Sequence, residues 1–113
     1  MTRVVVGYGR TGRSVVRFFE ERALSFWVAD DHLDPEAKTD LSTLQHCEGC
    51  STIAELSPAG GQTWIVSPGI PLTHPVFKLA IDQGVQLIND LHLFAQEVSG
   101  LLVGVTGSNG KST

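Results

Sequence analysis

Short apolar runs alternate with stretches of helical periodicity along the chain. The apolar runs predict strands over Arg3–Gly7, Leu24–Ala29, Thr63–Val66, Val85–Ile88 and Leu101–Thr106. Apolar residues spaced three or four apart predict helices over Thr11–Arg22, His74–Gln83 and Asp90–Val98, with Gly84 as a C-cap. Strands that alternate with helices pair in parallel. The pattern therefore predicts an α/β, Rossmann-like fold, in which a mostly parallel sheet of about five strands carries helices on both faces.

The stretch from Asp31 to about Cys50 interrupts this alternation. It is polar and rich in Asp and Pro, so we expect a loop with at most a short helix. Thr52–Leu56 is expected to form a helical turn before Pro58.

Composition narrows the classes of function. The 113 residues allow one ordinary domain, and 42% hydrophobic residues are enough for its core. The net charge of −4 argues against a nucleic-acid or anionic-membrane partner, which would favour a basic face. No apolar run reaches the roughly 18 residues needed to span a bilayer, and Met1–Arg3 leads into Val4 without a signal-peptide pattern. We therefore expect a cytoplasmic protein.

The two cysteines, Cys47 and Cys50, form a C-x-x-C pair preceded by His46. A structural zinc site needs four ligands, and the sequence has no second such pair. A redox pair would be expected where a strand meets a helix, whereas this one lies in a polar stretch. We therefore favour free surface thiols over a metal or redox site.

The first predicted strand ends in a glycine-rich turn. Gly7, Gly9 and Gly12 form G-x-G-x-x-G between a strand and a helix, which is the context of a phosphate-binding turn. Thr11 adds a hydroxyl donor, and Arg10 and Arg13 add positive charge nearby. The alternative is a turn whose glycines serve packing alone.

Two further loops follow strands at the same predicted sheet edge, where ligands of parallel sheets bind. Asp30 and Asp31 end the second strand, where an acid can bond a ribose or a base. The alternative is a pair of solvated turn carboxylates or a helix N-cap. Ser67–Pro71 follows the "TWIV" strand, and its prolines make it rigid enough to present Ser67 and backbone amides to a ligand. A plain turn remains equally possible.

The last stretch, "GVTGSNGKST" (Gly104–Thr113), indicates a nucleoside triphosphate site. Successive amides form an anion nest, Lys111 can reach the β- and γ-phosphates, and the Ser112 hydroxyl suits Mg²⁺. Val105 stands where the general G-x-x-x-x-G-K-[ST] pattern has its first glycine.

Taken together, "GYGRTGRS", "SPGIPLTHP" and "TGSNGKST" resemble the Mur ligase family, and within it the members that add D-glutamate. The resemblance covers the whole chain. Residues 1–100 correspond to the amino-terminal, UDP-substrate-binding domain, and residues 101–113 to the first strand and a truncated ATP-binding loop of the central domain. It implies ATP-dependent amide ligation in peptidoglycan precursor synthesis, with UDP-N-acetylmuramoyl-L-alanine, D-glutamate and ATP as substrates and Mg²⁺ as cofactor.

The resemblance also implies roles for individual residues. Arg10, Thr11 and Gly12 would meet the diphosphate, Asp30 and Asp31 the uracil, and Ser67, Pro68 and Gly69 the opposite wall. ATP would be held by Gly107, Ser108, Asn109, Gly110, Lys111, Ser112 and Thr113, with Lys111 as the catalytic residue on the phosphates and Ser112 on Mg²⁺. Two positions depart from the family pattern. His32 stands where some members have Arg, and His92 where an acid is usual.

Two other classes of function stay open. An NAD-type dinucleotide-binding domain would explain Gly7–Gly12 and Asp30 but not the Lys-Ser-Thr loop, and a scaffold domain would explain neither. Under the ligase hypothesis, the 113 residues alone lack parts that the reaction requires. We therefore expect the chain to bind the UDP part weakly, to retain no ATP or Mg²⁺, and to be inactive by itself.

Overall fold

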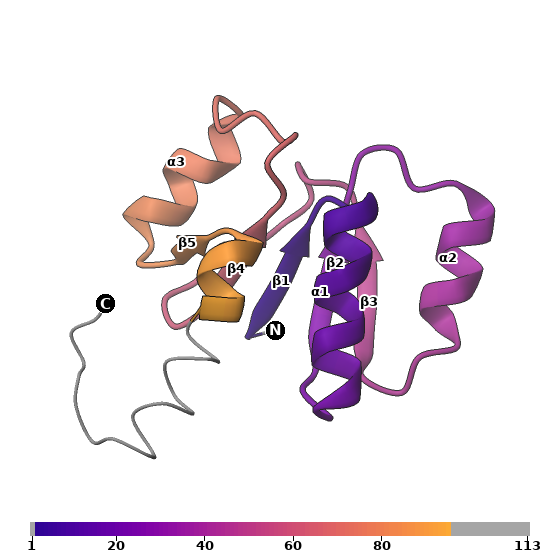
Figure 1. The fold of residues 1–113 in the computed structure, drawn as a ribbon. Helices are drawn as coiled ribbons and strands as arrows, with labels where there is room; N and C mark the ends of the chain where they lie inside the picture. The colour runs from indigo at the N-terminus through magenta and orange to yellow at the C-terminus, as the bar shows by residue number, and fades with distance from the viewer. Residues whose placement is uncertain (1, 96–113) are drawn as a thin grey trace, which may run out of the picture.

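A five-stranded, all-parallel sheet forms the centre of the structure, a computed structural model that describes residues 2–95. The strand order is β3-β2-β1-β4-β5 (Figure 1). The strands are β1 (Arg3–Val6), β2 (Phe26–Ala29), β3 (Cys47–Ser51), β4 (Thr63–Val66) and β5 (Gln86–Ile88). The helices are α1 (Arg10–Glu21), α2 (Pro35–Ser42) and α3 (Pro75–Asp82), and residues 90–95 are also helical. The predicted α/β, Rossmann-like fold is thus confirmed.

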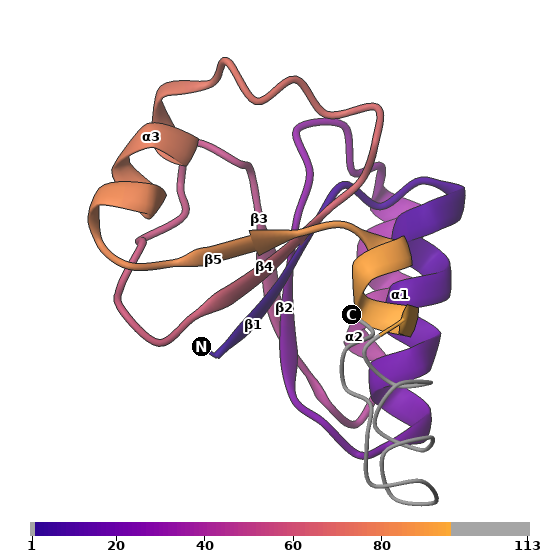
Figure 2. The same ribbon diagram turned by 60° about the vertical axis from the view of Figure 1, so that its left-hand side comes forward.

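Helices cover both faces of the sheet, as Figure 2 shows. In the central strand, Val4 and Val6 belong to the core under α3, while Val5 belongs to the core under α1 and α2. A strand covered on both faces carries apolar residues at consecutive positions, which explains the unbroken Val4–Val6 run. The two cores are built from Trp64, Val76, Phe77 and Ala80 on the α3 side, and from Val15, Phe19, Phe26 and Leu41 on the other.

The helix starts follow from local capping chemistry. The Asp34 side chain accepts a hydrogen bond from the Ala37 amide at 2.7 Å and so caps α2. His74 caps α3, and Pro75 occupies the first helical position, where its missing N–H costs nothing. At the other end of α3, Gly84 follows the C-cap with φ +89°. The predicted start and end of this helix are confirmed within one residue.

The prediction for the segment around the two cysteines was wrong. Cys47–Ser51 was expected to be loop, but it forms the edge strand β3. An edge strand is buried less than a central one, so its sequence can stay polar and show no apolar run. The described sheet has five strands, the number predicted, but its fifth member is β3, which was not among the predicted strands. The predicted strand Leu101–Thr106 lies outside the described residues.

The cysteines were also misplaced by the sequence prediction. The β2–β3 register shifts between Phe26 and Trp27, which pair with Cys47 and Gly49 respectively. This bulge places Cys47 and Cys50 on the same core, although residues three apart on a regular strand point to opposite faces. Both thiols are free, as predicted, but they are half-buried and not fully on the surface.

The remaining segments agree with the pattern. The Leu56 amide bonds the Ile53 carbonyl at 3.2 Å, within the predicted turn. Residues 90–95 start the predicted third helix, and Phe94 packs edge-on against Phe18 at 5.2 Å between ring centroids. Among the residues described, none forms a helix long and apolar enough to cross a membrane.

Candidate functional site

The loops after β1 and β4 meet where the strand order reverses. The chain runs from β1 outwards to β2 and β3, then crosses to β4 on the other side of β1. Ser67, which follows β4, donates a hydrogen bond from its hydroxyl to the Gly7 carbonyl at 3.4 Å. In open α/β sheets this crevice beyond the carboxyl ends of the strands is where ligands bind.

The glycine-rich turn has the predicted strand–turn–helix context. Gly7 has φ +98°, and a Cβ there would press on the Ser67 hydroxyl at 2.9 Å. A Cβ on Gly12 would overlap the Gly7 carbonyl oxygen, so Gly12 permits the close approach of α1 to β1. These two glycines therefore serve the fold itself.

Gly9 is different, because it caps α1 without any side-chain hydrogen bond. A Cβ at Gly9 would meet no other atom within 4 Å. The first amides of a helix without a side-chain cap, together with the helix dipole, favour an anion. Arg10 is exposed and Thr11 half-buried beside this open space.

The Arg13 guanidinium contacts the Tyr8 ring instead of the open start of α1. Its guanidinium lies 4.5 Å from the Tyr8 ring centroid, a cation–π contact. Both side chains line a hollow between α1 and Leu44. Burial raises the pKa of the Tyr8 phenol, and the Arg13 charge partly opposes that shift. Arg13 is thus held by the tyrosine.

The carboxylate of Asp30 joins two loops. One oxygen accepts from the Tyr8 amide at 2.6 Å, and the other accepts from the His32 amide at 2.6 Å. Asp31 accepts from the Ile53 amide at 2.9 Å through one oxygen. Both carboxylates therefore organise backbone, and each retains lone pairs that a ligand can use.

The acidic hollow, as we name it, lies between the β2 loop and the loop after β4. Its volume is about 250 Å³. Its lining residues are Asp30, Asp31, His32, Ile53, Gly69, Ile70, Pro71 and His74. The fold thus brings the two predicted carboxylates against the predicted Gly69 wall. It also adds His74, which the sequence suggested only as a helix start.

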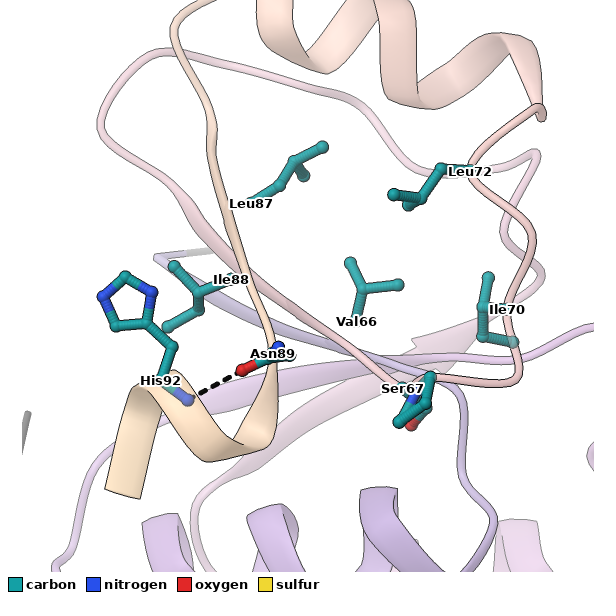
Figure 3. A pocket seen from close by; sticks show the side chains of 9 residues that line it. Val66, Ser67, Ile70, Leu72, Leu87, Ile88, Asn89 and His92 are labelled. Carbon is teal, nitrogen blue, oxygen red and sulfur yellow. Dashed lines mark hydrogen bonds between the residues drawn. The ribbon is translucent and has the colours of Figure 1, made fainter. Parts of the chain in front are cut away.

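A larger hollow of about 340 Å³ lies on the other side of the same loop, over β4 and β5. Leu72 and Leu87 flank it with Val66 between them, and Asn89 and His92 lie at one end (Figure 3). Ser67 and Pro68 line this hollow and not the acidic one. Its lining is mainly apolar, so it offers few groups that could orient a nucleotide.

Comparison with known proteins assigns the chain to a family. The profile of the family "Mur ligase MurD-like, N-terminal domain" matches residues 1–89. The chain belongs to this family. Three relatives are each called UDP-N-acetylmuramoylalanine--D-glutamate ligase. They come from Pseudomonas fluorescens (38% identical over 116 residues), Yersinia pestis (37% over 119) and Blochmanniella floridana (33% over 111).

These alignments cover 97–98% of the chain but only 24–25% of each relative. The chain therefore spans about a quarter of the length of these Mur ligases. Its family match lies over the whole described sheet, including the glycine-rich turn and the acidic hollow.

The ATP-loop residues predicted for the Mur ligase, Gly107–Thr113 with Lys111 and Ser112, lie outside the described residues, as does the predicted domain boundary at residue 100. Within residues 2–95, no three His, Cys, Asp or Glu side chains gather as metal ligands. The two histidines that depart from the family pattern, His32 and His92, lie in different hollows. His32 lines the acidic hollow, whereas His92 lines the apolar one and its amide bonds Asn89 at 2.7 Å.

Proposed function

We propose that this chain binds the UDP part of UDP-N-acetylmuramoyl-L-alanine, as the amino-terminal, UDP-substrate-binding domain (residues 1–100) of a D-glutamate-adding ligase. One observation carries the proposal. The open amino terminus of α1 and the acidic hollow lie at one sheet edge, in a chain whose relatives bear that ligase's name. The start of α1 could take the diphosphate, and the neighbouring hollow could take the base.

In this proposal the diphosphate lies at the start of α1, bound by the amides of Arg10, Thr11 and Gly12 and by the Thr11 hydroxyl. The uracil enters the acidic hollow, where Asp30 and Asp31 face it. Gly69 forms the opposite wall, and Ser67 and Pro68 continue that wall beyond the hollow. Because Asp30 bonds both the Tyr8 and the His32 amides, it also fixes the spacing between the phosphate and base positions.

The ligation itself is proposed for the whole parent protein, in the cytoplasmic synthesis of peptidoglycan precursors. The substrate carboxylate receives the γ-phosphoryl group of ATP, and the amine of D-glutamate then displaces phosphate to form the amide. Gly107–Thr113 would hold ATP, with Lys111 on its phosphates. The Ser112 hydroxyl would hold Mg²⁺, which neutralises phosphate charge when bound.

Calorimetric titration tests the binding proposal. UDP-N-acetylmuramoyl-L-alanine should bind the folded chain, and UDP should compete with it, whereas NAD should have no effect. Asp30 makes the contrast informative, since each of its oxygens already accepts from a backbone amide, which leaves fewer lone pairs for a ribose diol. Tight NAD binding without a UDP-ligand effect would overturn the proposal in favour of a dinucleotide domain.

A further inference from the structure

The His74 imidazole is held in one orientation by two contacts. Its Nδ1 accepts a hydrogen bond from the Val76 amide at 3.2 Å, which caps α3. Its ring packs edge-on against Phe77, with 6.3 Å between the centroids. A neutral imidazole whose Nδ1 accepts a hydrogen bond carries its proton on Nε2. His74 is therefore a donor of fixed direction.

The other ring nitrogen of His74 is available to a ligand. His74 is half-buried and lines the acidic hollow. Over residues 2–95, no group accepts a hydrogen bond from its Nε2, and no buried side-chain polar atom lacks a partner. Nε2–H is thus not sealed in the core, and it can donate to a group that enters the hollow.

The β2 loop, which also lines the hollow, presents acceptors. Asp31 uses one carboxylate oxygen for the Ile53 amide, and its second oxygen accepts from no group in the described part of the chain. A ligand edge with a donor next to a carbonyl acceptor would match both side chains: the donor would pair with the carboxylate and the carbonyl with the imidazole N–H. The imide edge of uracil has this order, whereas cytosine places an unprotonated ring nitrogen at the central position.

The size of the hollow supports a ring as its occupant. Pockets for complete drug-sized ligands start at about 300 Å³, and this hollow measures about 250 Å³. It therefore suits a base and leaves the phosphates and sugar outside the hollow.

We propose that the His74 Nε2–H donates a hydrogen bond to a carbonyl oxygen of the uracil base, beside the carboxylates that accept the imide N–H. His74 is then a specificity-determining residue that reads a pyrimidinedione. This inference rests on the proposed function and adds a base-reading side chain to its site.

Two variants separate the capping role of His74 from the base-reading role. His74→Asn keeps a good N-cap, because Asn is among the preferred capping residues, but it removes Nε2–H. His74→Ala removes both. Both variants should bind UDP about five- to tenfold more weakly than the wild-type chain, the size of one hydrogen bond. Inorganic pyrophosphate, which lacks the base, should bind all three equally. Both variants lose the Phe77 ring contact, and His74→Ala, which also loses the cap, should lower the melting temperature more than His74→Asn does.

Nitrogen-15 NMR of the imidazole gives a direct reading. UDP should shift the His74 Nε2 resonance, and pyrophosphate should not. If UDP binds the wild-type chain and His74→Asn equally and leaves this resonance unmoved, the inference fails while the proposed function stands. If the folded wild-type chain binds neither UDP nor UDP-N-acetylmuramoyl-L-alanine, the proposed function fails and the inference fails with it.

Discussion

At the residue scale, the three glycines of the first turn have different roles: Gly7 and Gly12 are required by packing, and Gly9 is not. Gly12 lies against the Gly7 carbonyl, so the fold requires it. Gly9 has an extended backbone with φ −88°, outside the left-handed region that favours glycine, and its missing side chain borders open space. The fold does not need a glycine there. The space suits a phosphate that must approach the backbone closely.

Replacement of Gly9 by Ala should separate binding from folding. The added methyl group occupies the proposed phosphate position, so affinity for UDP and pyrophosphate should fall more than tenfold. The loss of stability should stay near 1 kcal/mol, the cost of a poorer N-cap. Calorimetric titration and urea unfolding measure the two effects. Gly12→Ala is the contrasting variant, because its methyl group would overlap the Gly7 carbonyl and should unfold the chain. Unchanged affinity of Gly9→Ala for pyrophosphate would contradict the phosphate assignment.

The Cys47 thiol should react slowly in the folded chain. Burial is the main cause that raises its pKa above the ordinary value, so the thiolate forms only at higher pH. The unfolded thiol ionises first, near pH 8.5, and stability should therefore decline as pH rises from there through the folded pKa. Iodoacetamide alkylation of a Cys50→Ser variant at pH 8.5 should be slower in buffer than in urea. Equal rates would show that Cys47 is not protected.

At the element scale, single carboxylates join segments that are distant in sequence. Asp30 ties the loop after β1 to the loop after β2. Glu20, near the end of α1, accepts from the Gln45 and His46 amides at 2.9 and 3.0 Å and so holds the turn into β3. These links position an edge strand and a ligand loop that short-range propensity would not fix.

Asp30→Asn should loosen the site and lower stability. An amide offers one acceptor oxygen, so one of the Tyr8 and His32 amides would face an NH₂ group. The expected loss is about 1–3 kcal/mol in urea unfolding, with a parallel loss of UDP affinity. Asp31→Asn is the matched control, since Asp31 bonds only one amide. Equal stability of the two variants would mean that the two-loop link contributes little.

Glu20→Gln should weaken the turn between α2 and β3. The variant keeps one acceptor for two amides, so a loss of about 1 kcal/mol is expected. Amide hydrogen exchange in β3 should become faster, whereas β5, at the opposite edge, should be unaffected. Glu21→Gln, at the exposed neighbouring position, serves as the control. Unchanged exchange in β3 would argue that the strand is held by sheet pairing alone.

At the scale of the whole molecule, the proposed function gives the chain one of the several sites that ligation would require. It aligns with 24–25% of the length of its relatives. The proposed UDP site lies at one edge of its sheet, and the residues predicted to hold ATP lie outside residues 2–95.

The 113 residues should therefore bind UDP ligands but not catalyse. Incubation with ATP, Mg²⁺, UDP-N-acetylmuramoyl-L-alanine and D-glutamate should release no phosphate above the background without protein. A phosphate-release assay checks this, with a complete relative as the positive control. Sustained turnover by the chain would contradict it.

The sequence determined the parts that depend on local pattern. Val4–Val6 and the "TWIV" run of β4 predicted buried parallel strands, because burial on both faces leaves a continuous apolar signal. Pro75 after His74 marked a helix start through capping chemistry, and the spacing of Gly7, Gly9 and Gly12 indicated a phosphate turn. These signals lie within a few residues of one another, so the sequence alone carries them.

Tertiary structure decided what depends on partners distant along the chain. β3 is a strand because β2 pairs with it and Glu20 holds the turn before it, and its own residues give little sign of this. His74 became a candidate for base reading only when the crossover from β3 to β4 brought its loop against Asp30 and Asp31. Strand order and hydrogen bonds between distant residues, which no local pattern encodes, bring the components of the site together.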